Sequence, residues 1–210
     1  RAVRLLAPEF ADLPAEFVEK LSKSEATEIR GQAAWLTGIR GLGEHDLLIG
    51  LLDDPEPFVR RRAADALSRL ASPSADAKLI ERLGDPDRFV RYAAMTALAH
   101  RPTNEIITIG SKNDQPQILM RLLVAAHLRK QRPDAEVTIE FANRLLKSSN
   151  RNNEDETDLL RVLSLYKNEI ASNADCLQLA TSHLLKSYPH TNPTVRWEQT
   201  RLLGSYRIAT

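Results

Sequence analysis

Five histidines are available as metal ligands or proton carriers: His45, His100, His127, His183 and His190. None stands in a His-Glu-x-x-His arrangement, which places two imidazoles on one helical face around zinc. The one cysteine, Cys176, can form neither an internal disulfide nor a site with several thiolates, and its apolar neighbours favour a buried side chain. His127 lies in the apolar stretch 122–128, where a core or edge histidine is expected. These residues predict no metal centre and no cofactor.

Motifs for nucleophilic or phosphate chemistry are missing from the sequence as well. It contains no Gly-x-Ser-x-Gly turn and no Walker-type loop. The clustered glycines Gly38, Gly41 and Gly43 follow a helical stretch, where glycine commonly ends a helix. Of the adjacent acidic groups, we assign residues 53–54 to a helix cap and residues 154–156 to a solvated loop. The sequence therefore predicts a protein that is not an enzyme.

Length and composition are ordinary for a globular helical domain. Of the 210 residues, 42% are hydrophobic, 27% are charged and only 5% are aromatic. Leu and Ala dominate the apolar set, which favours helices packed through small side chains. The formal net charge of +1 creates no global field toward nucleic acid or an anionic membrane. No apolar run approaches the ~20 residues of a transmembrane helix, no signal peptide opens the sequence, and Arg1 as first residue suggests a segment of a longer protein.

An internal repeat of about 30 residues organises the chain. Residues 28–37, 58–67 and 89–98 align without gaps. The aligned copies share an arginine (Arg30, Arg60, Arg91), and alanine pairs recur at 33–34, 63–64 and 93–94. A fainter fourth copy starts at Leu119, and prolines recur at one point of successive units, at Pro55, Pro86 and Pro116.

Each repeat is expected to form two antiparallel helices. Asp54-Pro55 and Asp85-Pro86 are predicted helix starts, because aspartate caps free N–H groups and proline fits the first turn. The apolar face of the first helix should contain, in successive copies, Val59, Ala63, Ala66 and Leu67, then Val90, Ala94, Ala97 and Leu98. Second helices are predicted near 46–52 and 77–83, after breakers at 41–43 and 72–74. This pattern predicts an all-α, right-handed α-solenoid of about six hairpins, with first helices outside and second helices lining the concave side.

The pattern Asp-Pro-x-x-x-Val-Arg-x-x-Ala-Ala-x-Ala-Leu resembles the short bacterial HEAT repeats of the phycocyanobilin-lyase type, over residues 26–101. The resemblance implies arginine–aspartate pairs buried between neighbouring repeats, and the residues that match are Asp54, Arg60, Asp85 and Arg91. We interpret these four residues as structural. We expect a single solenoid over residues 1–210, with regular repeats at 26–117 and divergent, longer repeats at 118–210, as part of a larger protein.

The divergent part is predicted to form helices near 135–148, 157–171, 174–187 and 194–207. Residues 148–157 carry no apolar side chain and are predicted to form a solvated loop, the segment most prone to disorder. A second break is expected at 188–193. The last predicted helix would expose an apolar face without a following helix, which again suggests that the parent protein continues.

Three further resemblances bear on function. Deoxyhypusine hydroxylases resemble this fold but hold two iron ions with repeated His-Glu pairs, and no histidine here is followed by glutamate. Bilin lyase activity, which the repeat type suggests, lacks an evident chromophore site in this sequence. Residues 84–94, 158–166 and 183–189 are similar to the HEAT segment of large exported multi-domain c-type haem proteins of planctomycete-type bacteria. That resemblance implies a spacer in an exported, dehydrogenase-like haem protein, although the chain itself contains no Cys-x-x-Cys-His; without it, we expect a cytoplasmic protein.

The sequence thus predicts a non-catalytic scaffold that binds a protein or neighbouring domains of its own chain. In such a solenoid the exposed positions of the second helices usually form the recognition surface. Lys78, Glu81 and Arg82 point away from the apolar positions of their helix and form the candidate partner surface.

The alternative is a nucleic-acid-binding module. Arginines at 60–62 and Arg69 form one basic cluster, and residues 129–132 form another. Duplex binding through phosphates needs a contiguous stripe of Lys or Arg. The near-neutral charge and the separation of Trp35 from Trp197 in the sequence disfavour this alternative.

Overall fold

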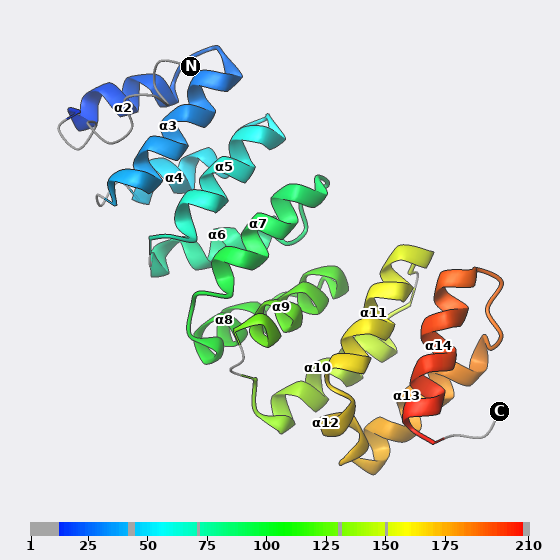
Figure 1. Ribbon diagram of the computed structural model, residues 1–210. Coiled ribbons are helices and arrows are strands. Elements are labelled where there is room, and N and C mark those ends of the chain that lie inside the picture. Colours follow the sequence, from blue (N-terminus) through cyan, green and yellow to red (C-terminus); the bar gives the residue numbers. More distant parts are fainter. Residues whose placement is uncertain (1–12, 42–44, 71, 130–131, 150, 208–210) are drawn as a thin grey trace. The chain divides into compact units, whose positions relative to one another are not determined.

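The computed structural model describes residues 13–41, 45–70, 72–129, 132–149 and 151–207. Within these ranges every regular element is a helix, which confirms the predicted all-α class (Figure 1). The chain forms two compact units, residues 1–112 and 113–210, and this boundary lies close to the predicted change from regular to divergent repeats. The single solenoid over both units, its handedness and its concave side stay predictions. None of the described helices is long and apolar enough to cross a membrane.

Long and short helices alternate in the first unit. The long helices are α3 (Thr27–Arg40), α5 (Pro57–Leu67) and α7 (Arg88–Leu98), and the short ones are α2 (Ala15–Ser22), α4 (His45–Leu51), α6 (Asp76–Arg82) and α8 (Thr103–Gly110), with a 3-10 turn, η2, at Pro73–Ala75. Because α3 packs against α5 and α5 packs against α7, the long helices form one layer. The two predicted second helices are confirmed as α4 and α6. Each of them packs more extensively on the long helix that follows it than on the one before it.

Small side chains allow the long helices to approach closely. The predicted apolar faces of α5 and α7 are buried at every position: Val59, Ala63, Ala66, Leu67, Val90, Ala94, Ala97 and Leu98. At Gly38 of α3, an added Cβ would lie 2.7 Å from the Cβ and 2.8 Å from the Cα of Ala66. These distances are shorter than any normal carbon–carbon contact, so this crossing of α3 and α5 requires glycine. The nearby Gly41 has a left-handed backbone (φ 62°) and ends α3 as predicted, whereas residues 42–44 lie outside the described residues.

The predicted helix starts at Asp54-Pro55 and Asp85-Pro86 were wrong by two residues. Helix α5 begins at Pro57, which occupies the first helical position, and α7 begins at Arg88. Asp54 and Asp85 instead fold the turn before each helix, because their Oδ1 atoms accept the N–H of the residue two positions later, both at 2.9 Å. In the repeat register, Pro116 at the start of α9 therefore corresponds to Pro57 and not to Pro55.

The second unit has the same layered construction with longer helices. Its elements are α9 (Pro116–Leu128), α10 (Ala135–Lys147), α11 (Asn153–Leu165), α12 (Lys167–Ala171), α13 (Ala174–Lys186) and α14 (Pro193–Ser205). α11 lies between α9 and α14, while α10 packs against α9, α12 and α13. The predicted helix over 157–171 is divided at Tyr166, whose ring is buried and whose hydroxyl donates a 2.7 Å hydrogen bond to the carbonyl of Leu123.

The expected loop over residues 148–157 is only partly a loop. Helix α11 begins at Asn153, and the side chain of Asn152 caps it by accepting the N–H of Asp155 at 2.8 Å. Asp155 and Thr157 are buried, and Glu156 forms ion pairs inside the unit. The prediction failed because it treated polar residues as solvated, whereas here they are hydrogen-bonded to one another and to helix ends. Residue 150 lies outside the described residues.

Candidate interaction surfaces

Two buried arginine–aspartate pairs join successive long helices. Arg30 of α3 donates Nε and Nη2 to Asp54 at 2.6 and 2.9 Å, and Arg60 of α5 donates the same two groups to Asp85 at 2.8 and 3.0 Å. Each guanidinium binds both oxygens of one carboxylate, the strong planar geometry that arginine provides. In the second pair, the Asp85 side chain has no exposed surface and that of Arg60 is 10% exposed.

The repeated arginines Arg60 and Arg91 also hold the turn before their own helix. Arg60 Nη1 donates to the carbonyls of Asp54 and Pro55, both at 2.8 Å, and Arg91 Nη1 donates to those of Asp85 and Pro86 at 3.0 and 2.9 Å. Each of these arginines thus fixes the entry of its own helix. Arg30 and Arg60 in addition contact the next repeat.

Asp54, Arg60, Asp85 and Arg91, which we interpreted as structural, all take part in these contacts, and Arg30 joins them. Asp54 pairs with Arg30 of the preceding repeat, whereas Arg60 reaches only its backbone carbonyl. The turn that follows Arg91 in the repeat pattern carries Asn113 in place of an aspartate. Its Oδ1 accepts the N–H of Gln115 at 2.9 Å, so the turn is kept while the carboxylate is lost.

The pKa of Asp85 is lowered by its partners. Burial alone would raise this pKa, but the hydrogen bonds from Arg60 and from the Asp87 N–H, with the charges of Arg60 and Arg82, outweigh burial. Burial is likewise outweighed at Asp54, where the hydrogen bonds from Arg30 and from the Glu56 N–H lower the pKa. Both carboxylates are held ionised for a structural purpose, so a depressed pKa here does not indicate a reactive group.

A third buried pair had not been anticipated from the repeat. Arg101, after the end of α7, donates Nε to both oxygens of Asp76 at 2.9 and 3.1 Å, and its Nη2 contacts Glu105 at 3.2 Å. These contacts connect α6 with α8. At Asp76 burial prevails over the arginine and raises the pKa. Neither residue stands in the aligned part of the repeat, so its pattern gave no signal for this pair.

Lys78, Glu81 and Arg82 lie close together on α6, and we call them the α6 cluster; their role as a partner surface stays a prediction. Lys78 Nζ lies 2.8 Å from Asp53 Oδ2 and 3.0 Å from Glu81 Oε2, and Arg82 Nη2 lies 3.3 Å from Asp53 Oδ1. Arg82 also reaches the buried Asp85 at 3.6 Å. The hydrogen bonds to Asp53 and Glu81 raise the pKa of Lys78. Charges in this cluster are thus already compensated by neighbouring groups.

The opposite layer carries a surface of exposed rings and arginines, which we call the α5–α7 face: Phe58, Arg61, Arg62, Arg88, Phe89 and Tyr92. The exposed fractions of Phe58, Phe89 and Tyr92 are 40%, 52% and 65%. The guanidinium carbons of Arg61 and Arg88 lie 5.5 and 4.9 Å from the centre of the Phe89 ring, and that of Arg62 lies 5.5 Å from the Phe58 ring. Sequence reasoning missed this face, although the two phenylalanines occupy the same position of successive repeats and could have indicated it.

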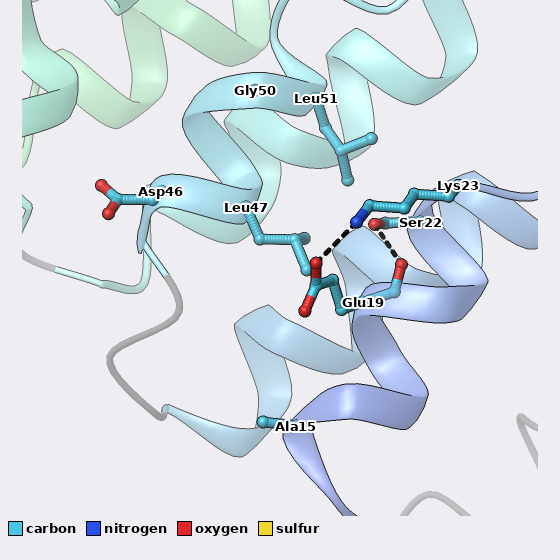
Figure 2. A pocket seen from close by; sticks show the side chains of 8 residues that line it. All are labelled: Ala15, Glu19, Ser22, Lys23, Asp46, Leu47, Gly50 and Leu51. Carbon is cyan, nitrogen blue, oxygen red and sulfur yellow. Dashed lines mark hydrogen bonds and ion pairs between the residues drawn. The ribbon is translucent and has the colours of Figure 1, made fainter.

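A shallow groove lies between α2 and α4 (Figure 2). It encloses about 470 Å³ and is lined by Ala15, Glu19, Ser22, Lys23, Asp46, Leu47, Gly50 and Leu51. Its charged pair, Lys23 and Glu19, is joined at 2.6 Å on the surface, and Ser22 Oγ donates to the Glu19 carbonyl at 2.7 Å. Asp46 points away from this pair in Figure 2, so the groove gathers no set of groups for acid–base chemistry.

The remaining chemical candidates, His127, His183 and Cys176, lie apart from the groove and from the α6 cluster in the sequence. His127 is half-buried and meets Tyr166 edge-on, with 6.0 Å between the ring centres. His183 Nε2 lies 2.6 Å from Glu156 Oε1. Cys176 is buried, which raises the pKa of its thiol. Among the described residues, no three His, Cys, Asp or Glu side chains are placed to hold a metal ion.

The residues proposed for nucleic-acid binding are divided between the two units. Trp35 is half-buried in the first unit and Trp197 is 69% exposed in the second. Within the basic run 129–132, residues 130–131 lie outside the described residues, and Arg132 pairs with Glu169 at 2.6 Å. Only the arginines of α5 remain as a cluster, and they belong to the α5–α7 face.

Comparison with known proteins agrees with this architecture. Residues 14–99, from α2 through α7, match the family described as HEAT repeats. The crystal structure of an engineered protein from the Northeast Structural Genomics Consortium is similar to all of this chain, with 20% identity and a TM-score of 0.50, and the chain spans 64% of its length. A second engineered protein of that consortium is 20% identical, with a TM-score of 0.45. Its match covers 98% of this chain and 89% of the engineered protein. No curated protein matches the chain. The match to HEAT repeats therefore covers residues 14–99, and the likeness of the whole chain to the first engineered protein shows a shared fold.

Proposed function

We propose that this chain is a non-catalytic scaffold that binds a protein partner, or another domain of its parent protein, through the α5–α7 face. The observation that carries the proposal is the exposure of three rings, Phe58, Phe89 and Tyr92, beside three arginines on two adjacent helices. Tyrosine, phenylalanine and arginine are enriched in protein interfaces, and buried aromatic and arginine anchors carry most of the binding energy.

The stack beneath this face is suited to presenting it rigidly. Arg60 crosses from α5 to Asp85 before α7, and Gly38 brings α3 into direct contact with α5. A surface on such a layer loses little conformational freedom when a partner binds, which favours affinity. Solenoids of helical repeats present extended surfaces of this kind to other proteins.

The α6 cluster is proposed only as a secondary contact. Lys78 and Arg82 already share Asp53 and Glu81, so a partner would have to replace ion pairs that exist in the free protein. Exchanges between surface ion pairs gain little free energy. The narrower resemblances, to the phycocyanobilin-lyase type and to exported haem proteins, stay predictions that the sequence flanking this chain would test.

The test is a pull-down from an extract of the source, read by mass spectrometry at low and moderate salt. Wild type is compared with the double variant Phe89→Ala/Tyr92→Ala and with Trp197→Ala, which removes an equally exposed ring from the second unit. We expect a defined protein, or other domains of the parent, to be lost with the double variant and retained with Trp197→Ala. Recovery of the same proteins by all three would contradict this assignment, and recovery of nucleic acid alone, lost as salt rises, would favour the alternative.

A further inference from the structure

We infer that the α5–α7 face recognises an acidic, extended polypeptide segment, whose carboxylates pair with Arg61, Arg62 and Arg88 while its apolar side chains lie on the exposed rings. This inference rests on the proposed function, since it assigns a ligand chemistry to the same face. It is carried by the geometry of the guanidinium groups, by the charge of the face and by the exposure of its rings.

The guanidinium groups are held in a position suited to carboxylates. Arg61 of α5 and Arg88 of α7 both lie over the ring of Phe89, at 5.5 and 4.9 Å from its centre. Both distances are within the range of a cation–π interaction. The two parallel N–H groups of a guanidinium match the two oxygens of a carboxylate.

The charge of this face is positive, in contrast to that of the α6 cluster. The outward positions of α5 and α7 carry Arg61, Arg62 and Arg88 against one carboxylate, Asp65, and the exposed Arg69 follows the end of α5. Of the two acidic residues directly before these helices, Glu56 and Asp87, the latter accepts the N–H groups of Phe89 and Val90. The α6 cluster has the opposite balance, with Lys78 and Arg82 beside Asp53, Glu81 and Asp85.

The internal ion pair of the face is weak enough to be replaced. Arg61 Nε lies 3.6 Å from Asp65 Oδ2, and the two side chains are 51% and 44% exposed. Exposed pairs at this spacing along a helix contribute little to stability. An incoming carboxylate with bidentate geometry therefore competes successfully for Arg61.

The rings and the charge pattern favour a peptide over nucleic acid. Phe89 already has guanidinium groups near it from both helices, so a base could stack there only by displacing them. The arginines alternate with exposed Phe58 and Tyr92, whereas a phosphate backbone requires a continuous cationic stripe. Apolar side chains of a peptide fit between such charges, since they bury the rings that solvent now covers.

The experiment uses the full chain and a fluorescent twelve-residue peptide probe of glutamate with leucine at every third position, read by anisotropy. The comparison probes replace glutamate by lysine, or are a single-stranded DNA of the same length. We expect saturable binding of the glutamate probe alone, weakened about tenfold by Arg61→Ala/Arg88→Ala, since tenfold corresponds to ~1.4 kcal/mol, the scale of one charge-assisted hydrogen bond. The variant Arg61→Lys/Arg88→Lys should lie between the two, because it keeps the charge and loses the planar fork.

The matched control is Arg196→Ala, which removes an exposed arginine beside the exposed Trp197 of the second unit and should leave binding unchanged. Circular dichroism of each variant checks that the helices are intact. Binding of the glutamate probe that is insensitive to Arg61→Ala/Arg88→Ala overturns the inference, and so does preferential binding of DNA. Failure of the glutamate probe to bind overturns it as well, but leaves the proposed function standing if the pull-down still loses a protein with Phe89→Ala/Tyr92→Ala.

Discussion

Replacing Arg60 by methionine tests how the repeats are held together. Methionine keeps most of the length and apolar contact of the arginine stem but donates none of its hydrogen bonds. The change removes two hydrogen bonds to Asp85 and two to backbone carbonyls. It leaves the fully buried Asp85 carboxylate with the N–H of Asp87 at 2.9 Å and with Arg82 Nη1 at 3.6 Å.

Removing one partner of a buried ion pair typically costs about 3–5 kcal/mol. We expect a value toward ~3 kcal/mol for Arg60→Met, because Arg82 and the Asp87 N–H still compensate part of the charge on Asp85. The exposed neighbour provides the matched control: Arg61→Met removes an arginine from the adjacent position and should cost less than about 1 kcal/mol, since its pair with Asp65 faces solvent.

A second variant separates the ion pair from the turn. Asp85→Asn keeps a side-chain oxygen that can accept the N–H of Asp87, as Asn113 does for Gln115 in the corresponding turn, but it removes the charge. In the double variant Arg60→Met/Asp85→Asn no buried charge is left without a partner, so its cost should be smaller than the sum of the single costs by about 1–3 kcal/mol.

Urea unfolding followed by helical circular dichroism measures these differences, with the transitions of the two units fitted separately where they are resolved. A cost for Arg60→Met that does not exceed the cost of Arg61→Met would refute the view that the buried pair holds the layer together. Additive costs in the double variant would show that the arginine acts through its two backbone carbonyls and not through Asp85.

Three further outcomes are expected. Gly38→Ala should destabilise the first unit by about 1–3 kcal/mol, because the added methyl group meets the backbone of α5. Gly50→Ala should stabilise it by up to about 1 kcal/mol, because no atom lies near the added carbon and alanine favours a helix. Thermal unfolding of the two variants compares these effects. Tyr166→Phe should cost about 0.5–1.5 kcal/mol in urea unfolding, because it removes the hydrogen bond from the Tyr166 hydroxyl to the carbonyl of Leu123 in α9. Burial would raise the pKa of Glu156, but hydrogen bonds from His183 and Arg151 outweigh burial and lower this pKa from its usual 4.5. The stability that ionised Glu156 contributes is therefore present above pH 4.5 and is lost as the pH falls through the lowered pKa. The difference in unfolding free energy between wild type and Glu156→Gln should shrink on acidification, and a constant difference would contradict this.

The regular repeats could be predicted because their signal lies in side-chain volume. Val59 and Ala63 recur at positions where only small or branched apolar groups fit between neighbouring helices, and both are fully buried. Such a pattern identifies a helical face without knowledge of its partner. The partners of charged groups are different, because sequence spacing does not say which of two carboxylates an arginine reaches. Asp54 was expected to serve Arg60 and is bound by Arg30.

Polar segments were predicted less well for a related reason. Residues 148–157 have the composition of a loop, yet Asn152 accepts the N–H of Asp155 at the start of α11, and Glu156 pairs with Arg151 and His183. Whether such groups face water or each other depends on the tertiary arrangement and not on their type. The α5–α7 face was missed because Phe58 and Phe89 belong to the apolar pattern by type, and only the packing shows that their rings stay exposed.

The α3–α5 and α5–α7 contacts differ in the residue that faces the phenylalanine of the repeat, which is Phe58 in the first contact and Phe89 in the second. An added Cβ at Gly31 would overlap the ring of Phe58, whereas the corresponding position of α5 carries Arg61, whose guanidinium lies over Phe89. The arginine–aspartate pair is common to both contacts and does not distinguish one neighbouring repeat from another. Exchanging the repeats, however, would place an arginine where the Phe58 ring now lies, so that this ring would have to move, and would leave Phe89 with Arg88 alone. These two positions therefore favour the present order of the repeats, and a duplicated or recombined repeat would have to rearrange its phenylalanine before it could stack in the same way.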